Sequence, residues 1–280
     1  MVEVLKEVQR LRSDLLLNMY NACLKAGIFN SSWKVARLVL ISKGKGDLDQ
    51  PSAYRPLSAA WADLCTEKDI GVLRSMQRRA LLAVTSAYRR TSWEGLCVVA
   101  GALPIDIQLE KHRALFNLRR GRDASIGELA IPSSMNNAAG CVKDEAVSVW
   151  QTRWASSQKG RTTFAFFKDV RERLAAGWLR PNHFTTQVLT GHGNFKSRLL
   201  TYGVVEDERC VCGGEADTVS HFLLDCPTFD PQRECLRDII PRECWNWPAA
   251  APFLVSTEEA FSALSDFCEE ALYLKGFLEA

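Results

Sequence analysis

A short cluster of three cysteines and one histidine restricts the fold of this chain more than any other feature of its sequence. Residues 210–226 read CVCGGEADTVSHFLLDC, so one residue separates the first two cysteines and four residues separate the histidine from the last cysteine. Zinc binds four thiolate or imidazole ligands in a tetrahedron, and a closed set of protein ligands is typical of structural sites, which leave no position for a reactive water. We therefore predict a structural zinc ion, and not a catalytic one, on Cys210, Cys212, His221 and Cys226.

Two alternatives to this ligand set stay open. Cys235 and Cys244 follow the cluster and could replace one of its ligands. The cluster could also be a chance arrangement of unrelated cysteines and a surface histidine. The first residues, MVEVLKEVQRLRSDLLL, contain early acidic residues and lack a small-residue cleavage site, so they are unlike a signal peptide and the ten cysteines are expected to be reduced. In a reduced protein, such a cluster indicates a metal site more than a disulfide framework.

The composition is that of a globular protein of one or two domains. Hydrophobic residues make up 47% and charged residues 24% of the 280 residues, values that exclude the disordered class. Apolar runs in the sequence stay shorter than the roughly 20 residues that a membrane helix needs. We therefore expect an intracellular protein without a membrane partner, and the sequence does not distinguish nucleus from cytoplasm.

The net charge of +2 hides an uneven distribution of basic and acidic residues. Residues 72–122 contain ten lysines and arginines against three acids, and residues 141–200 contain ten against four. By contrast, residues 201–240 contain three basic residues against nine acids, and residues 241–280 contain two against seven. Basic surfaces attract phosphate backbones, so RNA or DNA is a candidate partner for the middle of the chain. Ordinary solvated helix faces are the alternative interpretation.

The spacing of apolar residues predicts a mostly α-helical chain. Helices are expected over residues 3–27, 72–90, 92–101, 104–121, 141–156 and 162–176. A short β-branched run at residues 36–42 predicts one buried strand. The abundance of serine, asparagine, alanine and glycine in residues 123–140 predicts a linker. Thr91 and Glu94 fit a capping box at the start of the third helix.

Several segments together resemble the C-terminal half of a known type of polyprotein. WKVARLVLISKGKGD followed by AYRPLS is similar to the start of a reverse-transcriptase domain. QRRALLAVTSAYRRTSWEGLCVVAGALPIDI is similar to the helical region after the polymerase palm. DVRERLAAGW, TQVLTGHGNF and the cysteine cluster are similar to a terminal linker and a CCHC zinc knuckle. The family is that of the non-LTR retrotransposon reverse transcriptases, of the kind that insert into insect ribosomal DNA.

The resemblance implies a relative of an RNA-directed DNA polymerase that has lost its catalytic centre. In the family, a nicked chromosomal strand primes DNA synthesis on the RNA of the transposable element. Polymerase chemistry needs two metal ions held by clustered carboxylates. The palm that supplies them has no counterpart between residues 58 and 71, and the sequence contains no Asp-Asp pair. We therefore expect no catalytic residue and no bound magnesium in this chain.

The resemblance and the charge distribution predict seven segments along the chain. It comprises a fingers remnant (1–58), a deletion junction (59–71), thumb-like helices from beyond the palm (72–122), a linker (123–140), a basic helical linker region (141–200), a CCHC zinc-knuckle-like module (201–240) and an acidic helical tail (241–280). The expected fold class is mostly α, with a small α/β fingers remnant at the N-terminus, a helical middle and a small C-terminal zinc-knuckle-like module.

Nine basic residues are candidates for contact with nucleic acid, because charge-assisted hydrogen bonds to phosphate are strong. The resemblance implies three in the fingers segment, Lys43, Lys45 and Arg55. The charge distribution adds six in the middle of the chain, Arg78, Arg79, Arg89, Arg90, Arg119 and Arg120. Three tryptophans could stack on unpaired bases, although the protein core is the favoured place for them: Trp93, Trp150 and Trp154.

These observations predict a degenerate reverse transcriptase of a non-LTR retrotransposon, without a catalytic palm, that retains nucleic-acid binding through basic helices and a zinc knuckle. An alternative is a host-adopted helical protein that binds protein partners, with a structural zinc site and an acidic tail that docks through Phe261, Leu264 and Phe267. A relic without a selected function is a third interpretation. An enzyme of another class is least favoured, because the sequence has no GxSxG or HExxH motif.

Overall fold

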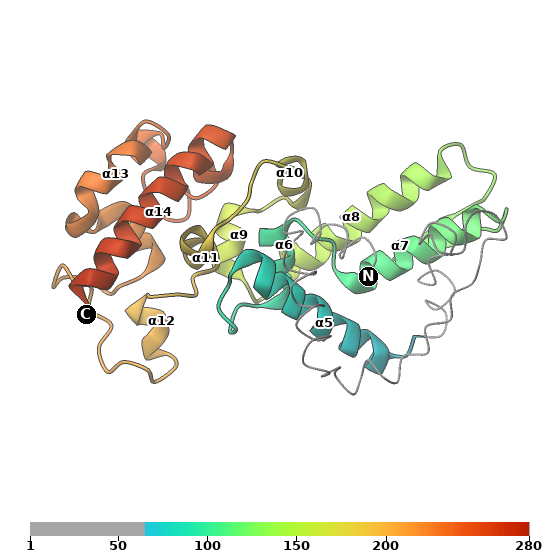
Figure 1. Ribbon diagram of the computed structural model, residues 1–280. Helices are drawn as coiled ribbons and strands as arrows, with labels where there is room; N and C mark the ends of the chain where they lie inside the picture. Colours follow the sequence, from blue (N-terminus) through green and yellow to red (C-terminus); the bar gives the residue numbers. More distant parts are fainter. Residues whose placement is uncertain (1–64, 280) are drawn as a thin grey trace, which may run out of the picture. The chain divides into compact units, whose positions relative to one another are not determined.

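The computed structural model describes residues 65–279, and this part of the chain is mostly helical (Figure 1). The α-helices are α5 (Glu67–Thr85), α6 (Trp93–Ala100), α7 (Ile105–Leu118), α8 (Ala138–Ser156), α9 (Arg161–Phe166), α10 (Val170–Ala175), α11 (His183–Thr190), α12 (Lys196–Leu200), α13 (Asp230–Arg237) and α14 (Glu258–Leu278). Shorter helical turns are η2 (His221–Asp225), η3 (Pro227–Phe229), η4 (Arg242–Cys244) and η5 (Phe253–Val255), and the strands are β1 (Ala124–Ile126) and β2 (Leu129–Ile131).

The expected fold class, mostly α with a C-terminal cluster of cysteine and histidine, is confirmed for the described residues. The single sheet among residues 65–279 has two strands. The helix expected over residues 3–27, the strand expected over residues 36–42 and the fingers remnant lie outside the described residues.

The chain divides into two compact units. Unit 1 contains Ile105–Ala146 together with the described residues up to Leu73, and unit 2 contains Arg74–Pro104 and the chain from Val147 onward. The helices α5 and α8 each have residues in both units. The domain boundaries expected from the sequence stay a prediction.

In unit 1, a short hairpin packs against a helix. The strands β1 and β2 pair antiparallel, with Ala124 opposite Ile131, and β1 contacts α7. Ile126 and Ile131 are buried, and Gly127 at the turn has a φ of 54°, a left-handed conformation that glycine adopts without strain. The hairpin lies within residues 123–140, where composition predicted a linker.

The cap of α6 lies one residue later than the sequence pattern indicated. The hydroxyl of Ser92, and not that of Thr91, accepts a hydrogen bond from the Gly95 N–H at 3.1 Å. Thr91 is buried, and its carbonyl accepts a hydrogen bond from Arg78 at 3.0 Å. The expected capping box of Thr91 with Glu94 is therefore replaced by a single serine cap.

The helix predicted over residues 162–176 is divided into α9 and α10. The Nε1–H of Trp154 donates to the carbonyl of Phe167 at 2.7 Å. Asp169 then caps α10 by accepting the Arg171 N–H at 2.7 Å. An aspartate whose side chain binds the backbone two residues later favours a new helix start over helix continuation, which explains the break that apolar periodicity alone did not predict.

The C-terminal helix α14 forms the centre of the last part of unit 2. Thr257 caps its first turn by accepting the Ala260 N–H at 3.1 Å, and α14 packs against α13, α11 and η5. In Figure 1, α13 and α14 lie side by side. The apolar face of Phe261, Leu264 and Phe267 is buried in this packing, so this face serves the core of the chain itself. Within residues 65–279, no helix has the length and apolar character needed to cross a membrane.

Candidate metal centre

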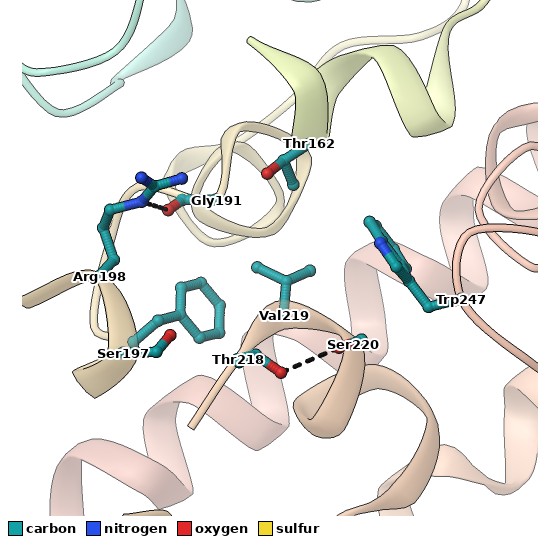
Figure 2. Close-up of a pocket in the computed structure, with 9 residues that line it drawn as sticks. Thr162, Gly191, Ser197, Arg198, Thr218, Val219, Ser220 and Trp247 are labelled. Atoms are coloured by element: carbon teal, nitrogen blue, oxygen red, sulfur yellow. Dashed lines mark hydrogen bonds between the residues drawn. The ribbon is translucent and has the colours of Figure 1, made fainter. Parts of the chain in front are cut away.

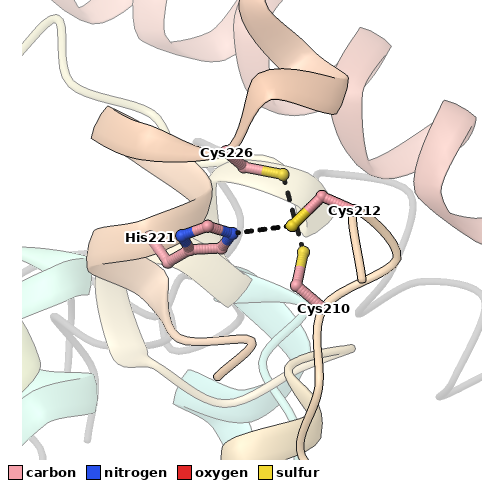
Figure 3. A group of neighbouring side chains, drawn as sticks. All are labelled: Cys210, Cys212, His221 and Cys226. Carbon is pink, nitrogen blue, oxygen red and sulfur yellow. Dashed lines mark hydrogen bonds between the residues drawn. The ribbon is translucent and has the colours of Figure 1, made fainter. Parts of the chain in front are cut away.

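The first two cysteines of the cluster lie on a tight turn in unit 2. The Cys210 N–H donates to the carbonyl of Glu215 at 2.9 Å, and the Gly213 N–H donates to the carbonyl of Cys210 at 2.9 Å. Gly213 has a φ of 78°, which a residue with a side chain adopts only with strain. The closed turn holds Cys210 and Cys212 at neighbouring corners of the cluster (Figure 3).

The histidine and the last cysteine lie at the two ends of a π-helical turn, η2. The Cys226 N–H donates to the carbonyl of His221, five residues earlier, at 2.8 Å. In an α-helix, at about 100° per residue, side chains five positions apart would point about 140° away from each other. The hydrogen bonds of a π-helix run from residue i to residue i+5, so the wider turn brings these two positions to one side. The sequence predicted one helical turn here, and the π form lets both side chains face the same point.

The four side chains converge in space, as Figure 3 shows. Their candidate ligand atoms all lie within 4.8 Å of one another. The Sγ atoms of Cys210 and Cys226 are 3.5 Å apart, and Sγ of Cys212 is 3.4 Å from Nε2 of His221. With zinc–sulfur bonds of about 2.3 Å, the sulfur ligands of a tetrahedral site are about 3.8 Å apart. The cluster therefore has the donor atoms and the spacing to hold a zinc ion.

Other cysteines of this region lie apart from the cluster. Among residues 65–279, the group of side chains that could share a metal ion comprises the four residues of the cluster. Cys235 lies on α13, where its Sγ is 3.3 Å from the carbonyl of Gln232 and 3.7 Å from that of Ala263. The arrangement thus favours the original ligand set over one that includes Cys235 or Cys244.

The orientation of His221 suits a metal ligand. Its Nε2 faces the thiols, whereas its Nδ1 lies 3.6 Å from a carboxylate oxygen of Glu215. This Nδ1 is buried and has no hydrogen-bond partner within the described part of the chain. Metal-bound histidines commonly donate their second N–H to a carboxylate, which fixes the tautomer. Glu215, which sequence analysis did not single out, is placed to accept that proton.

The thiols of the cluster differ in acidity. Burial, together with the adjacent thiol of Cys226, raises the pKa of Cys210 to about 12. Burial also acts to raise the pKa of Cys212, but the Gly214 N–H and the neighbouring thiols outweigh it and lower that pKa. Zinc binds the thiolate form and displaces the proton. Metal binding here would therefore release protons and weaken as the pH falls.

A buried arginine forms hydrogen bonds with the backbone of the π turn. Arg233 of α13 is 1% exposed, and its guanidinium donates to the carbonyls of Phe222, Leu223 and Cys226 at 3.1, 2.8 and 2.7 Å. It also donates to a carboxylate oxygen of Asp230 at 2.7 Å, which balances its charge. Carbonyls at the end of a helical turn lack partners within the turn, and here one side chain donates to three of them, of which that of Cys226 also accepts the Phe229 N–H at 3.3 Å.

A buried ion pair connects the cluster to the C-terminal helix. Asp217, between the two pairs of candidate ligands, and Lys275 of α14 have side chains that are both 0% exposed, and Nζ of Lys275 donates to Oδ2 of Asp217. The same oxygen accepts the Lys196 N–H at 2.7 Å, and Nζ also donates to the carbonyl of Asn194. Neither Asp217 nor Lys275 was predicted from the sequence, because the partners are 58 positions apart.

A hollow of about 210 Å³ lies next to the π turn (Figure 2). Its walls combine hydroxyl groups, one arginine and one tryptophan, contributed by Thr162, Gly191, Phe195, Ser197, Arg198, Thr218, Val219, Ser220 and Trp247. The hydroxyl of Thr218 accepts the His221 N–H at 3.1 Å and lies 2.9 Å from the Ser220 hydroxyl. Arg198 donates to the carbonyl of Gly191 at 3.4 Å. The segment that starts the π turn thus also forms one wall of this hollow.

The structure distributes the predicted nucleic-acid contacts over separate regions. Arg79, Arg89 and Arg90 are exposed in unit 2. Arg78 is half-buried, and its guanidinium donates to the carbonyls of Arg89 and Thr91.

The remaining predicted contacts lie elsewhere. Arg119 and Arg120 are exposed in unit 1. Lys43, Lys45 and Arg55 lie outside the described residues. The assignment of all these residues to nucleic-acid contact stays a prediction.

Two of the three tryptophans that could have stacked on bases serve the core. Trp150 and Trp154 are each 1% exposed. Trp93 is half-buried, and its Nε1–H donates to Gln77 at 3.0 Å. Trp150 and Trp154 are therefore too deeply buried to stack on a base.

Comparison with known proteins finds similarity to polyproteins of transposable elements. Over 212 residues it is 40% identical to the Pol polyprotein from the type-1 retrotransposable element R1 4 of Nasonia vitripennis, an alignment that covers 74% of this chain and 54% of that protein. The chain is homologous to R1-type retrotransposon Pol polyproteins over most of its length.

Two further relatives agree. The Pol polyprotein of element R1 2 from the same wasp is 25% identical over 78% of this chain and 54% of the relative. A 115 kDa protein of element R1DM in Drosophila melanogaster, described as putative, is 28% identical over 71% of this chain and 20% of the relative. The chain therefore spans about half the length of the first of these relatives. No family model and no solved structure matches the chain.

Proposed function

We propose that this chain is a nucleic-acid-binding derivative of an R1-type retrotransposon polyprotein, that it holds a structural zinc ion, and that it has no polymerase activity of its own. The proposal rests first on the homology over most of the chain. The absence of an Asp-Asp pair from the sequence argues against a two-metal polymerase centre. The observation that carries the zinc assignment is the convergence of three thiols and one imidazole within 4.8 Å.

In this proposal the zinc ion holds the fold and the arginines contact the nucleic acid. Residues 201–240, which contain the cluster, have nine acids against three basic residues and would repel phosphate. The exposed arginines Arg79, Arg89 and Arg90 have the opposite charge. Phosphate contacts of this kind release counterions, so affinity falls steeply as salt is added.

The test combines metal analysis with binding measurements on the whole chain. Elemental analysis of the purified protein should give about one zinc per chain, and the double variant Cys210→Ser/Cys226→Ser should lose it. Fluorescence anisotropy with labelled RNA at two salt concentrations should show binding that weakens with salt. A chain without zinc, or one whose binding is absent at low salt, would contradict the proposal.

A pair of charge-matched variants locates the contact surface. Replacing Arg79, Arg89 and Arg90 by alanine should weaken binding and reduce the salt slope by about 2, at about 0.7 per lost single-strand phosphate contact. The control replaces three arginines of the acidic part of the chain by alanine, Arg209, Arg237 and Arg242, and changes the net charge equally. Equal losses from both triple variants would mean that net charge, and not this surface, determines binding.

A protein-binding role is the second candidate, and one observation favours it. Tyr273 and Phe277, four positions apart on α14, are 76% and 77% exposed, and exposed apolar side chains that lie next to one another are typical of protein-interaction sites. A chain that contains zinc, is well folded and fails to bind RNA or DNA at any salt concentration would support this role over the first.

A further inference from the structure

A second hollow in unit 2, larger than the one beside the metal centre, has the character of a stacking site. Its volume is about 560 Å³, within the range of small-ligand sites. It is lined by Ser86, Ala87, Tyr88, Arg89, Arg90, His183, His192, Gly193, Leu199 and Tyr202. Four of these have aromatic or imidazole rings, two are arginines, and the lining contains no acidic residue.

The rings of the hollow are arranged in two groups. In the first group, the Tyr88 ring lies 5.7 Å from the His183 ring, and Tyr88 is 44% exposed. In the second group, the guanidinium carbon of Arg90 lies 4.3 Å from the centre of the Tyr202 ring. The Tyr202 hydroxyl is 3.1 Å from Nδ1 of His192, which ties this ring in place. The lining of the hollow therefore offers an exposed ring and also a guanidinium that is stacked on a second ring.

The loop that presents Tyr88, Arg89 and Arg90 is fixed at several points. His183 donates from Nδ1 to the carbonyl of Ser86 at 3.1 Å, because a carbonyl can only accept. Arg78 donates to the carbonyls on either side of Arg90.

The start of this loop is held as well. Ser86 has a φ of 52°, a left-handed conformation that is uncommon for residues other than glycine. Thr186 of α11 donates from its hydroxyl to the carbonyl of Thr85 at 2.8 Å. A loop held in this way keeps its side chains in one arrangement before a ligand arrives.

We propose that this hollow binds an unpaired nucleotide of single-stranded RNA or DNA, with the base stacked on Tyr88 and the flanking phosphates on Arg89 and Arg90. Rings with interspersed arginines are how proteins bind single strands without reading their sequence. The two arginines and the absence of acids from the lining favour a phosphate-bearing ligand over a cationic one. The inference rests on the proposed nucleic-acid binding and adds the site and the preference for single strands.

The test compares single aromatic substitutions in the whole chain. Tyr88→Leu should weaken the binding of labelled oligouridine and oligothymidine about 5- to 150-fold, the equivalent of one lost stacked base, and leave the salt slope unchanged. Tyr88→Trp should retain the affinity. Tyr273→Leu, which removes an exposed tyrosine from α14, is the matched control and should bind as the original chain does. A base-paired duplex should bind more weakly than either oligonucleotide and respond little to Tyr88→Leu.

The outcomes separate this inference from the broader proposal. If the original chain binds no nucleic acid, both are wrong. If it binds single strands and Tyr88→Leu binds them equally well, the stacking site is wrong and the broader proposal stands. A loss with Tyr88→Leu that Tyr88→Trp shares would also overturn the stacking role, because indole stacks at least as well as phenol. Zinc content and thermal unfolding of each variant confirm that it is folded, which the exposure of Tyr88 leads us to expect.

Discussion

Removing one partner of the buried ion pair between Lys275 and Asp217 should destabilise the chain strongly, and this is the sharpest test of the C-terminal packing. In Lys275→Met, a side chain of similar length replaces the lysine, and the carboxylate of Asp217 stays buried. Oδ2 would keep the hydrogen bond from the Lys196 N–H, whereas Oδ1 already has no hydrogen-bond partner within the described residues. The variant therefore leaves a buried charge without its counter-charge.

The magnitude follows from this burial. Removing one partner of a buried ion pair costs about 3–5 kcal/mol, a large part of the roughly 5–15 kcal/mol that stabilises a typical domain. Asp217→Asn should cost a similar amount, because it leaves the ammonium of Lys275 buried beside a neutral amide. The double variant Asp217→Asn/Lys275→Met should cost less than the sum of the two, since no buried charge is left in it.

A second lysine provides the matched control. Lys196 forms an ion pair with Glu279 at 3.4 Å, but its side chain is 29% exposed. Lys196→Met should therefore cost less than Lys275→Met, because this pair is partly accessible to solvent.

Urea unfolding followed by circular dichroism, with zinc in excess in all samples, measures these differences. If Lys275→Met and Lys196→Met lose equal stability, or if the losses in the double variant are additive, then the reasoning from burial is wrong.

Two further predictions concern the surroundings of the cluster and the hollow. Arg233→Met should weaken zinc binding about 10- to 100-fold, as loss of an outer-shell partner usually does, because the carbonyls of Phe222, Leu223 and Cys226 lose the guanidinium that donates to them. Competition with a chromogenic chelator measures this loss. Arg237→Met, on the exposed side of the same helix, should bind zinc normally. Burial, and then the charge of Arg198, lower the pKa of His192 from 6.5 to about 4. Between these pH values the imidazole is protonated in the unfolded chain but not in the folded chain. The free energy of unfolding should therefore fall as the pH drops from 6.5 towards 4. The fall should be shallower in His192→Phe, and an unchanged pH dependence of urea unfolding in this variant would contradict the assignment.

Sequence patterns predicted those parts of the structure that depend on residues close to one another in the sequence. The four residues of the cluster lie within 17 positions, and their chemistry alone indicated a shared metal ion. Helices with a regular apolar stripe, such as α8 and α14, were recognisable because burial of one face repeats every turn. Where a side chain interrupts the periodicity, as Asp169 does between α9 and α10, the pattern failed because a cap competes with continuation of the helix.

The residues that hold the cluster in place, Arg233 and Lys275, could not be predicted from the sequence, because their partners are distant in sequence or belong to the backbone. Arg233 resembles any other arginine in a short polar helix, and only the structure shows that it faces three carbonyls. Lys275 lies in a segment with two basic residues against seven acids, where a surface position was the natural expectation. The hollow with Tyr88 and Tyr202 likewise joins residues 114 positions apart.

The donors of Arg233 and Lys275 determine how small a working zinc-binding fragment can be. A peptide that ends at Cys226 would contain every candidate ligand. It would lack the guanidinium that holds the π turn and the ammonium that neutralises Asp217. An expression fragment that preserves the geometry of the site must therefore continue through α13 to the end of α14. Metal affinity measured on shorter peptides would underestimate the affinity of the complete chain.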